Sequence, residues 1–269
     1  MAPEAKVTAA TLRARKGTGE RIAVLTAYDV VFARLADGAG IDVVLVGDSL
    51  GMVVQGERST LAVTLDEMVY HTRIAARGVT RAHLVADMPF MSYQASVEDG
   101  MRAAERLMKE GHAEAVKLEG GVEVAELCRR LVRAGIPVMG HVGLTPQSIH
   151  QFGGFKVQGR TDAQRAQILA DAGALSDAGA YAIVLEAIPH ALAGEITRAV
   201  SALTIGIGAG AECYGQVMVM HDLLGLQPSW KPRFVRRYAE MGKAAGEAFA
   251  AYAADVRAGK FPAAEETYE

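Results

Sequence analysis

Acidic side chains recur in this chain directly after short apolar runs, a position from which carboxylates could act together in catalysis. Asp48, Asp87, Glu119 and Glu186 follow four such runs, and His141 follows a fifth. If Asp48, Asp87 and Glu119 converge, their repulsion must be relieved either by protonation or by a bound cation. Oxygen ligands without convergent Cys or paired His favour a hard ion, so the pattern indicates Mg²⁺ rather than Zn²⁺.

The same residues indicate which reaction the cation would serve. A magnesium ion held by few protein oxygens keeps open positions, and a 2-oxo acid could fill them with its carboxylate and keto oxygens. This chelation would acidify the carbon beside the carbonyl by stabilising the enolate. Glu186, if it lies outside the metal ligands, is then the natural base for that proton. Lys117 precedes Glu119 by two residues, so both side chains point the same way along a strand.

Each of these residues also has a purely structural interpretation. A carboxylate directly after a strand is commonly the N-cap of the following helix. Lys117 could extend along apolar surface or pair with Glu119, and His141 could be a core histidine bonded to a backbone carbonyl. Carboxylates or a histidine at the ends of five successive strands are more than capping requires, which favours the functional interpretation.

The elements that must position these residues are eight short apolar runs alternating with helix-like segments. The runs span residues 22–25, 43–46, 83–86, 115–118, 137–140, 182–185, 204–207 and 217–220. Near-continuous apolar runs are typical of strands buried on both faces in parallel sheets. Helices are expected over residues 65–77, 96–110, 122–134, 164–177 and 244–256. Thr64 with Glu67 forms a capping-box pattern for the first, and glycines follow the ends of several others.

This alternation predicts a single-domain (β/α)8 TIM barrel over residues 1–269. An open doubly wound sheet would usually place a glycine-rich phosphate turn after its first strand, and residues 26–29 read Thr-Ala-Tyr-Asp instead. Barrel enzymes keep their active sites at the carboxyl ends of the strands, so the acidic residues are expected to share one pocket.

Composition narrows the class of protein further. The 269 residues carry a formal net charge of −3, which gives no broad attraction to nucleic acid or anionic lipid. Cys128 and Cys213 share no metal-ligand spacing, so reduced thiols are expected. Residues 1–17 do not form a signal peptide, and no apolar run is long enough to span a membrane. A cytoplasmic location is therefore expected.

Two glycine-rich stretches have less specific meanings. The stretch 152–160, Phe-Gly-Gly-Phe-Lys-Val-Gln-Gly-Arg, suits a mobile flap over the site or an ordinary surface turn. The stretch 206–210, Gly-Ile-Gly-Ala-Gly, lacks the βαβ context of a dinucleotide fingerprint. Close packing, or close approach of the backbone to a ligand, explains it better.

Several long motifs resemble the ketopantoate hydroxymethyltransferase family, in order and from Thr26 to the last helix. They span residues 26–29, 46–52, 86–91, 116–121, 140–148, 153–160 and 185–186. The resemblance implies transfer of a hydroxymethyl group from 5,10-methylenetetrahydrofolate to 3-methyl-2-oxobutanoate, giving 2-dehydropantoate. This is the first committed step toward pantothenate and coenzyme A.

The resemblance also implies roles for individual residues. It maps the Mg²⁺ contacts onto Asp48, Asp87 and Glu119, contacts to the oxo acid also onto Ser49 and Lys117, and the base onto Glu186. His141 is a possible supporting residue. Family members typically form homodecamers, so a homo-oligomer is expected.

The chain departs from the family pattern at one position. Where the family usually carries an aspartate before Gly-Gln, this chain has Tyr214, which exchanges a charged acceptor for a neutral phenol. Any part of this loop in folate access or subunit contact is therefore in doubt.

Three alternatives to a hydroxymethyltransferase fit the sequence less well. A lyase or mutase of the phosphoenolpyruvate/pyruvate barrel superfamily would chelate an oxo acid similarly, but the lyases' Lys-Lys/Arg-Cys-Gly-His loop is absent. A non-catalytic barrel would be expected to lose some of the residues that bind the metal, bind the substrate or act as the base. All five of these are present, namely Asp48, Asp87, Lys117, Glu119 and Glu186. A module that binds only folate would not need the carboxylates.

Overall fold

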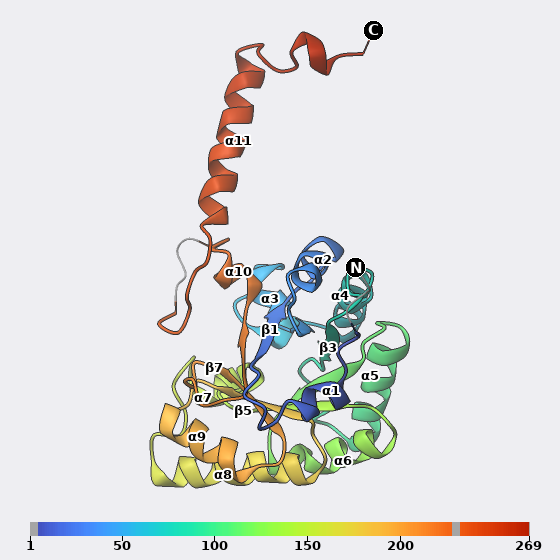
Figure 1. Ribbon diagram of the computed structural model, residues 1–269, viewed down its shortest axis with the longest axis vertical. Coiled ribbons are helices and arrows are strands. Elements are labelled where there is room, and N and C mark those ends of the chain that lie inside the picture. Colours follow the sequence, from blue (N-terminus) through green and yellow to red (C-terminus); the bar gives the residue numbers. More distant parts are fainter. Residues whose placement is uncertain (1–4, 228–231, 269) are drawn as a thin grey trace. The chain divides into compact units, whose positions relative to one another are not determined.

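The computed structural model describes residues 5–227 and 232–268. The chain divides into two compact units, Met1–Met218 and Val219–Glu269. The first unit contains the eight-stranded closed barrel, in which every neighbouring pair is parallel and β8 closes the barrel against β1 (Figure 1). The predicted TIM-barrel architecture is confirmed.

The strands begin within two residues of their predicted positions and often extend further toward their carboxyl ends. They are β1 (Ile22–Thr26), β2 (Val43–Val46), β3 (His83–Asp87), β4 (Ala115–Glu119), β5 (Val138–Gly143), β6 (Ala182–Glu186), β7 (Leu203–Ile207) and β8 (Gly215–Met218). Asp87, Glu119 and Glu186 are therefore the last residues of strands, and His141 lies within one, rather than after it. Strand pairing continues through these polar residues because the neighbouring strands supply backbone partners.

Helices lie outside the barrel and connect most of the strands. The first unit contains α1 (Ala9–Ala14), α2 (Val30–Gly38), α3 (Leu50–Val53), α4 (Leu65–Ala76), α5 (Val97–Lys109), α6 (Ala125–Arg133), α7 (Ile149–Phe152), α8 (Asp162–Asp177) and α9 (His190–Ala199). Short 3₁₀ turns η1 (Thr60–Ala62), η2 (Val122–Val124) and η3 (Pro146–Ser148) precede α4, α6 and α7. The Thr64–Glu67 capping box of α4 is confirmed, and Ser96 is the N-cap of α5.

No helix lies in the described chain between β7 and β8, although the predicted alternation of strands and helices would place one there. The prediction began β8 at Val217, whereas the strand begins at Gly215. Only residues 208–214 connect the two strands, and they form bends and turns rather than a helix. These seven residues must return from the carboxyl end of β7 to the amino end of β8. Little length remains for a helix, because a helix advances only about 1.5 Å per residue whereas extended chain advances about 3.3 Å.

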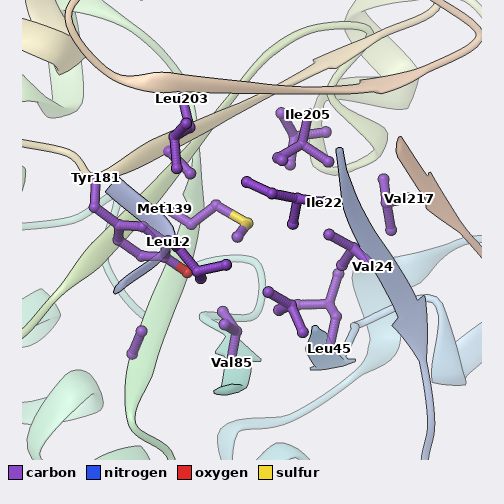
Figure 2. Close-up of a cluster of buried hydrophobic side chains, with 14 of the residues drawn as sticks. Leu12, Ile22, Val24, Leu45, Val85, Met139, Tyr181, Leu203, Ile205 and Val217 are labelled. Carbon is purple, nitrogen blue, oxygen red and sulfur yellow. The ribbon is translucent and has the colours of Figure 1, made fainter. Parts of the chain in front are cut away.

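The amino-terminal half of the barrel interior is an apolar core. Apolar side chains from all eight strands meet there, together with Tyr181, which directly precedes β6 (Figure 2). Leu12 of α1 is 1% exposed and joins this cluster, so α1 covers the amino end of the barrel. This packing leaves the carboxyl end as the place where polar side chains gather.

The second unit contains α10 (Met220–Leu223), α11 (Met241–Arg257) and the turn η4 (Ala264–Glu266). The predicted helix 244–256 lies within α11. No residue of α11 is buried, although the helix carries Phe249, Tyr252 and Val256. Across the described residues, no helix combines the length and apolar character needed to traverse a bilayer.

Candidate active site

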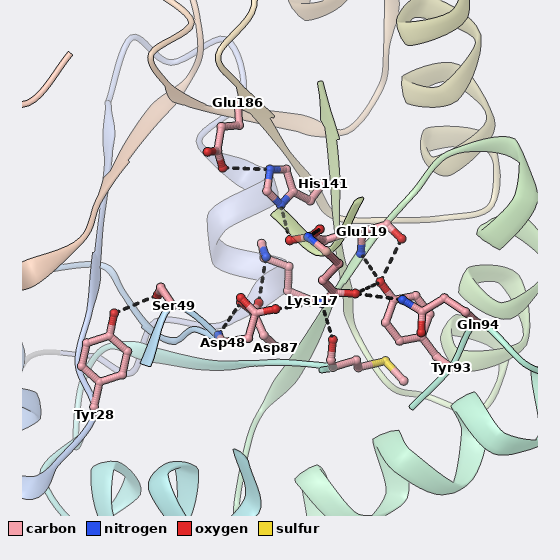
Figure 3. Close-up of polar contacts among 12 residues, drawn as sticks. Tyr28, Asp48, Ser49, Asp87, Tyr93, Gln94, Lys117, Glu119, His141 and Glu186 are labelled. Carbon is pink, nitrogen blue, oxygen red and sulfur yellow. Dashed lines mark hydrogen bonds and ion pairs between the residues drawn. The ribbon is translucent and has the colours of Figure 1, made fainter. Parts of the chain in front are cut away.

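Six of the seven predicted site residues gather at the carboxyl-terminal rim of the barrel, and Ser49 lies beside them (Figure 3). Asp48, Asp87, Lys117, Glu119 and His141 are each no more than 6% exposed. None of the carboxylates caps a helix: the N-caps of α3, α5, α6 and α9 are Ser49, Ser96, Val124 and Pro189. The capping interpretation therefore does not account for these residues.

Asp87 connects Asp48, which follows β2, with Lys117 on β4. Its Oδ1 accepts a hydrogen bond from Lys117 Nζ at 2.9 Å, and its Oδ2 accepts one from the Asp48 backbone N–H at 3.0 Å. Lys117 therefore pairs with Asp87 rather than with Glu119. A side chain on Gly47 would bring its Cβ to 2.8 Å from Ser49 Oγ and 3.4 Å from Asp87 Oδ2. Glycine is needed there because the polar groups close over the backbone.

His141 bridges Glu119 and Glu186. Its Nδ1 lies 3.3 Å from Glu119 Oε1, and its Nε2 lies 3.2 Å from Glu186 Oε2. Both are ion-pair contacts, and within the described residues neither ring nitrogen forms a hydrogen bond with regular geometry. Burial and Lys117 lower the pKa of His141, but the contacts with the two carboxylates outweigh them and raise it to about 9. The imidazole is therefore a cation at neutral pH, and it does not serve as a neutral core histidine.

The carboxylates are close enough to alter one another's ionisation. Burial raises the pKa of Asp48 well above its usual value, and the negative charges of Asp87 and Glu119 raise it further. Burial lowers the pKa of Lys117, but Asp87, Glu119 and Asp48 together raise it above the ordinary lysine value. With Glu186, the site holds four carboxylates against the two cations Lys117 and His141, an excess of two negative charges when all are ionised.

This donor set fits a hard divalent cation. The available ligand atoms are carboxylate oxygens, which Mg²⁺ prefers, and the ion would compensate the excess negative charge. In the described part of the chain, no three His, Cys, Asp or Glu side chains are already arranged to hold an ion together. Glu119 Oε2 instead accepts the Gln147 backbone N–H at 2.9 Å. Assignment of Asp48, Asp87 and Glu119 as ligands therefore stays a prediction.

Ser49 has a hydroxyl partner at the edge of the site. Its Oγ lies 2.9 Å from the Tyr28 hydroxyl, and either group can donate. Burial raises the pKa of Tyr28, so its phenol remains protonated at neutral pH. Tyr28 follows β1 within one of the motifs of the family resemblance, but its type alone gave no reason to place it beside Ser49.

The sequence did not single out Gln147 and Tyr93, which belong to the same network. The Gln147 side-chain amide donates to Asp48 Oδ2 at 2.8 Å and accepts from the Tyr93 hydroxyl at 2.8 Å. The Glu119 backbone N–H donates to the Tyr93 hydroxyl at 2.9 Å. A glutamine next to a proline in a loop has no chemical signature, so only its contacts reveal this placement.

The glycine-rich stretches have different surroundings. In the 152–160 stretch, Gln158 N–H donates to the carbonyl of Ala187, which directly follows Glu186, at 2.9 Å. Mobility of this flap stays a prediction. In the 206–210 stretch, a Cβ on Gly206 would lie 3.0 Å from the Gln216 amide, and one on Gly210 would lie 2.6 Å from His190 Cβ. Close packing explains these two glycines.

Tyr214 lies at the opposite rim from the acidic residues. It directly precedes β8, its carbonyl accepts the Ile22 N–H at 3.0 Å, and Lys16 Nζ lies 5.6 Å from the centre of its ring. The loop after β7 crosses to the amino-terminal rim before it reaches this position. The departure from the family pattern therefore leaves the acidic site untouched.

Comparison with known proteins adds independent information. A family model described as ketopantoate hydroxymethyltransferase matches residues 6–264. A relative from Anaeromyxobacter sp. (strain K) is 57% identical over 265 residues, covering 97% of this chain and 87% of the relative. One from Moorella thermoacetica is 54% identical over 269 residues, covering 100% of both. Both bear the name 3-methyl-2-oxobutanoate hydroxymethyltransferase.

Solved structures show the shared fold. A phosphonopyruvate hydrolase superposes with a TM-score of 0.63 at 12% identity, covering 98% of this chain and 92% of the other. A 2,3-dimethylmalate lyase of the PEP mutase/isocitrate lyase superfamily superposes with a TM-score of 0.60 at 19% identity, covering 98% and 93%. At this identity the likeness concerns architecture alone.

Proposed function

The chain belongs to the ketopantoate hydroxymethyltransferase family, and from this premise we propose the reaction that its acidic rim carries out. It is an enzyme of the hydroxymethyltransferase class. The proposed reaction transfers a one-carbon unit from 5,10-methylenetetrahydrofolate to 3-methyl-2-oxobutanoate and forms 2-dehydropantoate. It supplies the first step of pantothenate synthesis.

The observation that supports this proposal is that His141 stands between Glu186 and the carboxylates that would hold Mg²⁺. Asp48 and Asp87 lie on the Lys117 side, whereas Glu186 contacts the other ring nitrogen of His141. Asp48, Asp87 and Glu119 would hold Mg²⁺. Bound there, the ion would polarise the carbonyl of the oxo acid and stabilise the enolate. Ser49 and Lys117 would bind the same substrate through hydrogen bonds to its oxygens.

Glu186 is placed to act as the base. It is the last residue of β6 and is more exposed than the other carboxylates, with 15% of its side chain accessible. It would take the proton from C3 of the oxo acid, and the positive charge of His141 would keep Glu186 oriented. The C3 carbanion equivalent then forms a bond to the methylene carbon. The two carbon–nitrogen bonds of that methylene carbon break, and water supplies the hydroxyl group. The second proton of the water and the proton that Glu186 took from C3 would pass to the two nitrogens of the departing tetrahydrofolate.

An assay of the purified full-length protein tests this function. Complete mixtures contain methylenetetrahydrofolate, 3-methyl-2-oxobutanoate and Mg²⁺, and product is measured by chromatography with and without chelator. We expect 2-dehydropantoate only when all three components are present. Folded protein that forms no product in the complete mixture would reject the assignment.

Exchange of the C3 proton tests the role of Glu186 separately. In deuterated water without folate, the wild-type enzyme with Mg²⁺ should exchange this proton, and Glu186→Gln should lose about 10²–10⁴-fold in rate. Both proteins should bind the oxo acid, because glutamine keeps the size of the side chain. Unchanged exchange would remove Glu186 from the base role.

We further propose a cytoplasmic homo-oligomer, with a homodecamer as the expected form. The free, buried thiols of Cys128 and Cys213 suit a reducing compartment. The exposed aromatic side chains of α11 supply apolar surface that a second copy could cover. Neither membrane nor nucleic acid is a proposed partner.

A further inference from the structure

Gln147 contacts two of the acidic residues at the rim, Asp48 and Glu119. It lies in η3, which follows β5 after two intervening residues, and is 6% exposed. Its amide nitrogen donates to Asp48 Oδ2 at 2.8 Å and to the Met88 carbonyl at 2.9 Å. Its amide oxygen accepts from the Tyr93 hydroxyl and from Gln94 Nε2, both at 2.8 Å.

These four contacts allow only one orientation of the amide. A glutamine amide has two N–H donors and one oxygen with two acceptor sites, and each is used. Rotating the amide by 180° would place its oxygen against the Asp48 carboxylate and the Met88 carbonyl, both of which are acceptors. It would also point one of its N–H groups at the Gln94 Nε2 donor. The surroundings therefore hold the nitrogen toward Asp48.

The contact with Gln147 leaves the Asp48 carboxylate with one occupied oxygen and one open oxygen. Within the described residues, the Gln147 amide is the hydrogen-bond donor to the Asp48 carboxylate, at Oδ2, and Oδ1 has no hydrogen-bond partner. Both oxygens of Asp87 have donors, as does Oε2 of Glu119. Among the described contacts of Asp48, Asp87 and Glu119, Asp48 Oδ1 is thus the carboxylate oxygen that needs no donor or ion-pair partner displaced before it can bind a cation.

We propose that Gln147 is a positioning residue that presents Asp48 Oδ1 to the divalent cation as a single-oxygen ligand. The inference rests on the proposed function, because that function supplies the cation. Groups that orient a metal-binding side chain contribute to metal affinity without touching the ion. The amide bonds Oδ2 and so holds the Asp48 carboxylate in one orientation before the cation arrives. Less conformational entropy is then lost when the cation binds.

The two contacts of Gln147 with the acidic rim can be separated by mutation. Its backbone N–H bonds Glu119 Oε2, and its side chain bonds Asp48 Oδ2. Gln147→Met keeps the backbone contact and approximately the side-chain volume but removes the amide. Gln147→Asn keeps an amide that is one methylene too short to reach Asp48. A shared effect of both variants would therefore report on the contacts of the Gln147 amide, of which the one with Asp48 is to a carboxylate, rather than on polarity or volume.

Titration of the full-length protein with Mg²⁺ alone, followed by calorimetry, measures this effect without turnover. Both variants should bind Mg²⁺ about 10–100-fold more weakly than the wild type. Gln94→Met is the matched control, since it removes one donor to the Gln147 oxygen but touches no carboxylate, and it should bind Mg²⁺ nearly as well as wild type. In activity assays the Mg²⁺ concentration for half-maximal rate should rise by the same factor, while turnover at saturating Mg²⁺ recovers.

The outcomes distinguish this inference from the proposed function. If the wild type binds Mg²⁺ and both folded variants bind it within about twofold of wild type, which is about 0.4 kcal/mol, Gln147 has no positioning role. If the wild type itself shows no saturable Mg²⁺ binding, the metal part of the proposed function fails, and the role of Gln147 falls with it. A turnover defect that saturating Mg²⁺ does not correct would also contradict the proposal.

Discussion

At the scale of single residues, Lys117 shows how a buried cation is stabilised by its neighbours. Its Nζ bonds Asp87 Oδ1 at 2.9 Å, and the side chains of the pair are 6% and 5% exposed. Removing one partner of such a pair leaves an uncompensated buried charge, which costs about 3–5 kcal/mol. Lys117→Met should therefore lower the free energy of unfolding by that amount in Mg²⁺-free urea titrations.

A surface lysine provides the control for this measurement. Lys109 pairs with Glu105 on an exposed face of α5, with 72% of the lysine side chain accessible. Lys109→Met should leave the urea midpoint unchanged, because solvent screens exposed pairs. Equal losses in the two variants would show that burial of the Lys117 charge contributes nothing to stability.

His141 gives a pH dependence whose direction follows from its neighbours. Its pKa is raised to about 9 in the folded protein by Glu119 and Glu186, whereas an unfolded histidine titrates near 6.5. A raised pKa means that the protonated form stabilises the fold fully below about pH 6.5. This contribution is lost as the pH rises through about 9.

The measurement is an NMR titration of the histidine side chains in Mg²⁺-free protein. The His141 midpoint should lie near 9 in the wild type and should move toward the unperturbed value in Glu186→Gln, which lacks one of the two charges. A wild-type midpoint near 6.5 would contradict the bridging contacts described above.

At the scale of elements, the packing of α8 onto β5 depends on a glycine. A Cβ on Gly140 would lie 2.7 Å from Leu175 Cδ1, closer than ordinary van der Waals contact. Gly140→Ala should therefore destabilise the protein by about 1–3 kcal/mol through overpacking. Adding Leu175→Val should recover part of this loss, because the shortened side chain makes room.

Gly173 on the same helix is the matched control. A Cβ there meets nothing within 4 Å, so Gly173→Ala should be neutral or stabilising by up to about 1 kcal/mol through helix propensity. Thermal unfolding of the four variants gives the comparison. If Gly140→Ala and Leu175→Val lose stability additively, the two positions do not share a contact.

At the scale of the whole molecule, the exposed residues of α11 concern assembly. Phe249, Tyr252 and Val256 are 71%, 59% and 45% exposed, and their spacing places them on one side of the helix. Phe249→Glu combined with Val256→Glu should shift the proposed homodecamer toward smaller species in light scattering, because charge opposes burial of this stripe. Ala251→Glu, on the opposite side, should leave the mass unchanged. A full-size assembly of the double variant would exclude this stripe from the interface.

The sequence by itself determined the order of strands and the residues at their carboxyl ends. Strand runs and capping residues such as Thr64 depend on neighbours a few positions away, so they can be read locally. The alternation of strands and helices predicts a parallel barrel. Because the carboxyl ends of parallel strands lie at one rim, Asp87, Glu119 and Glu186 must share it. The family motifs then indicated the substrates.

Only the tertiary structure decided which atoms meet. Whether Lys117 pairs with Asp87 or Glu119 depends on the register of β3 and β4, which places Asp87 opposite Lys117. The contact from Gln147 to Asp48 joins residues 99 positions apart, and no local pattern encodes it. The position of Tyr214 at the amino-terminal rim likewise depends on the connection between β7 and β8, which contains no helix. Such contacts follow from closure of the barrel, because closure brings the ends of distant strands within hydrogen-bond reach.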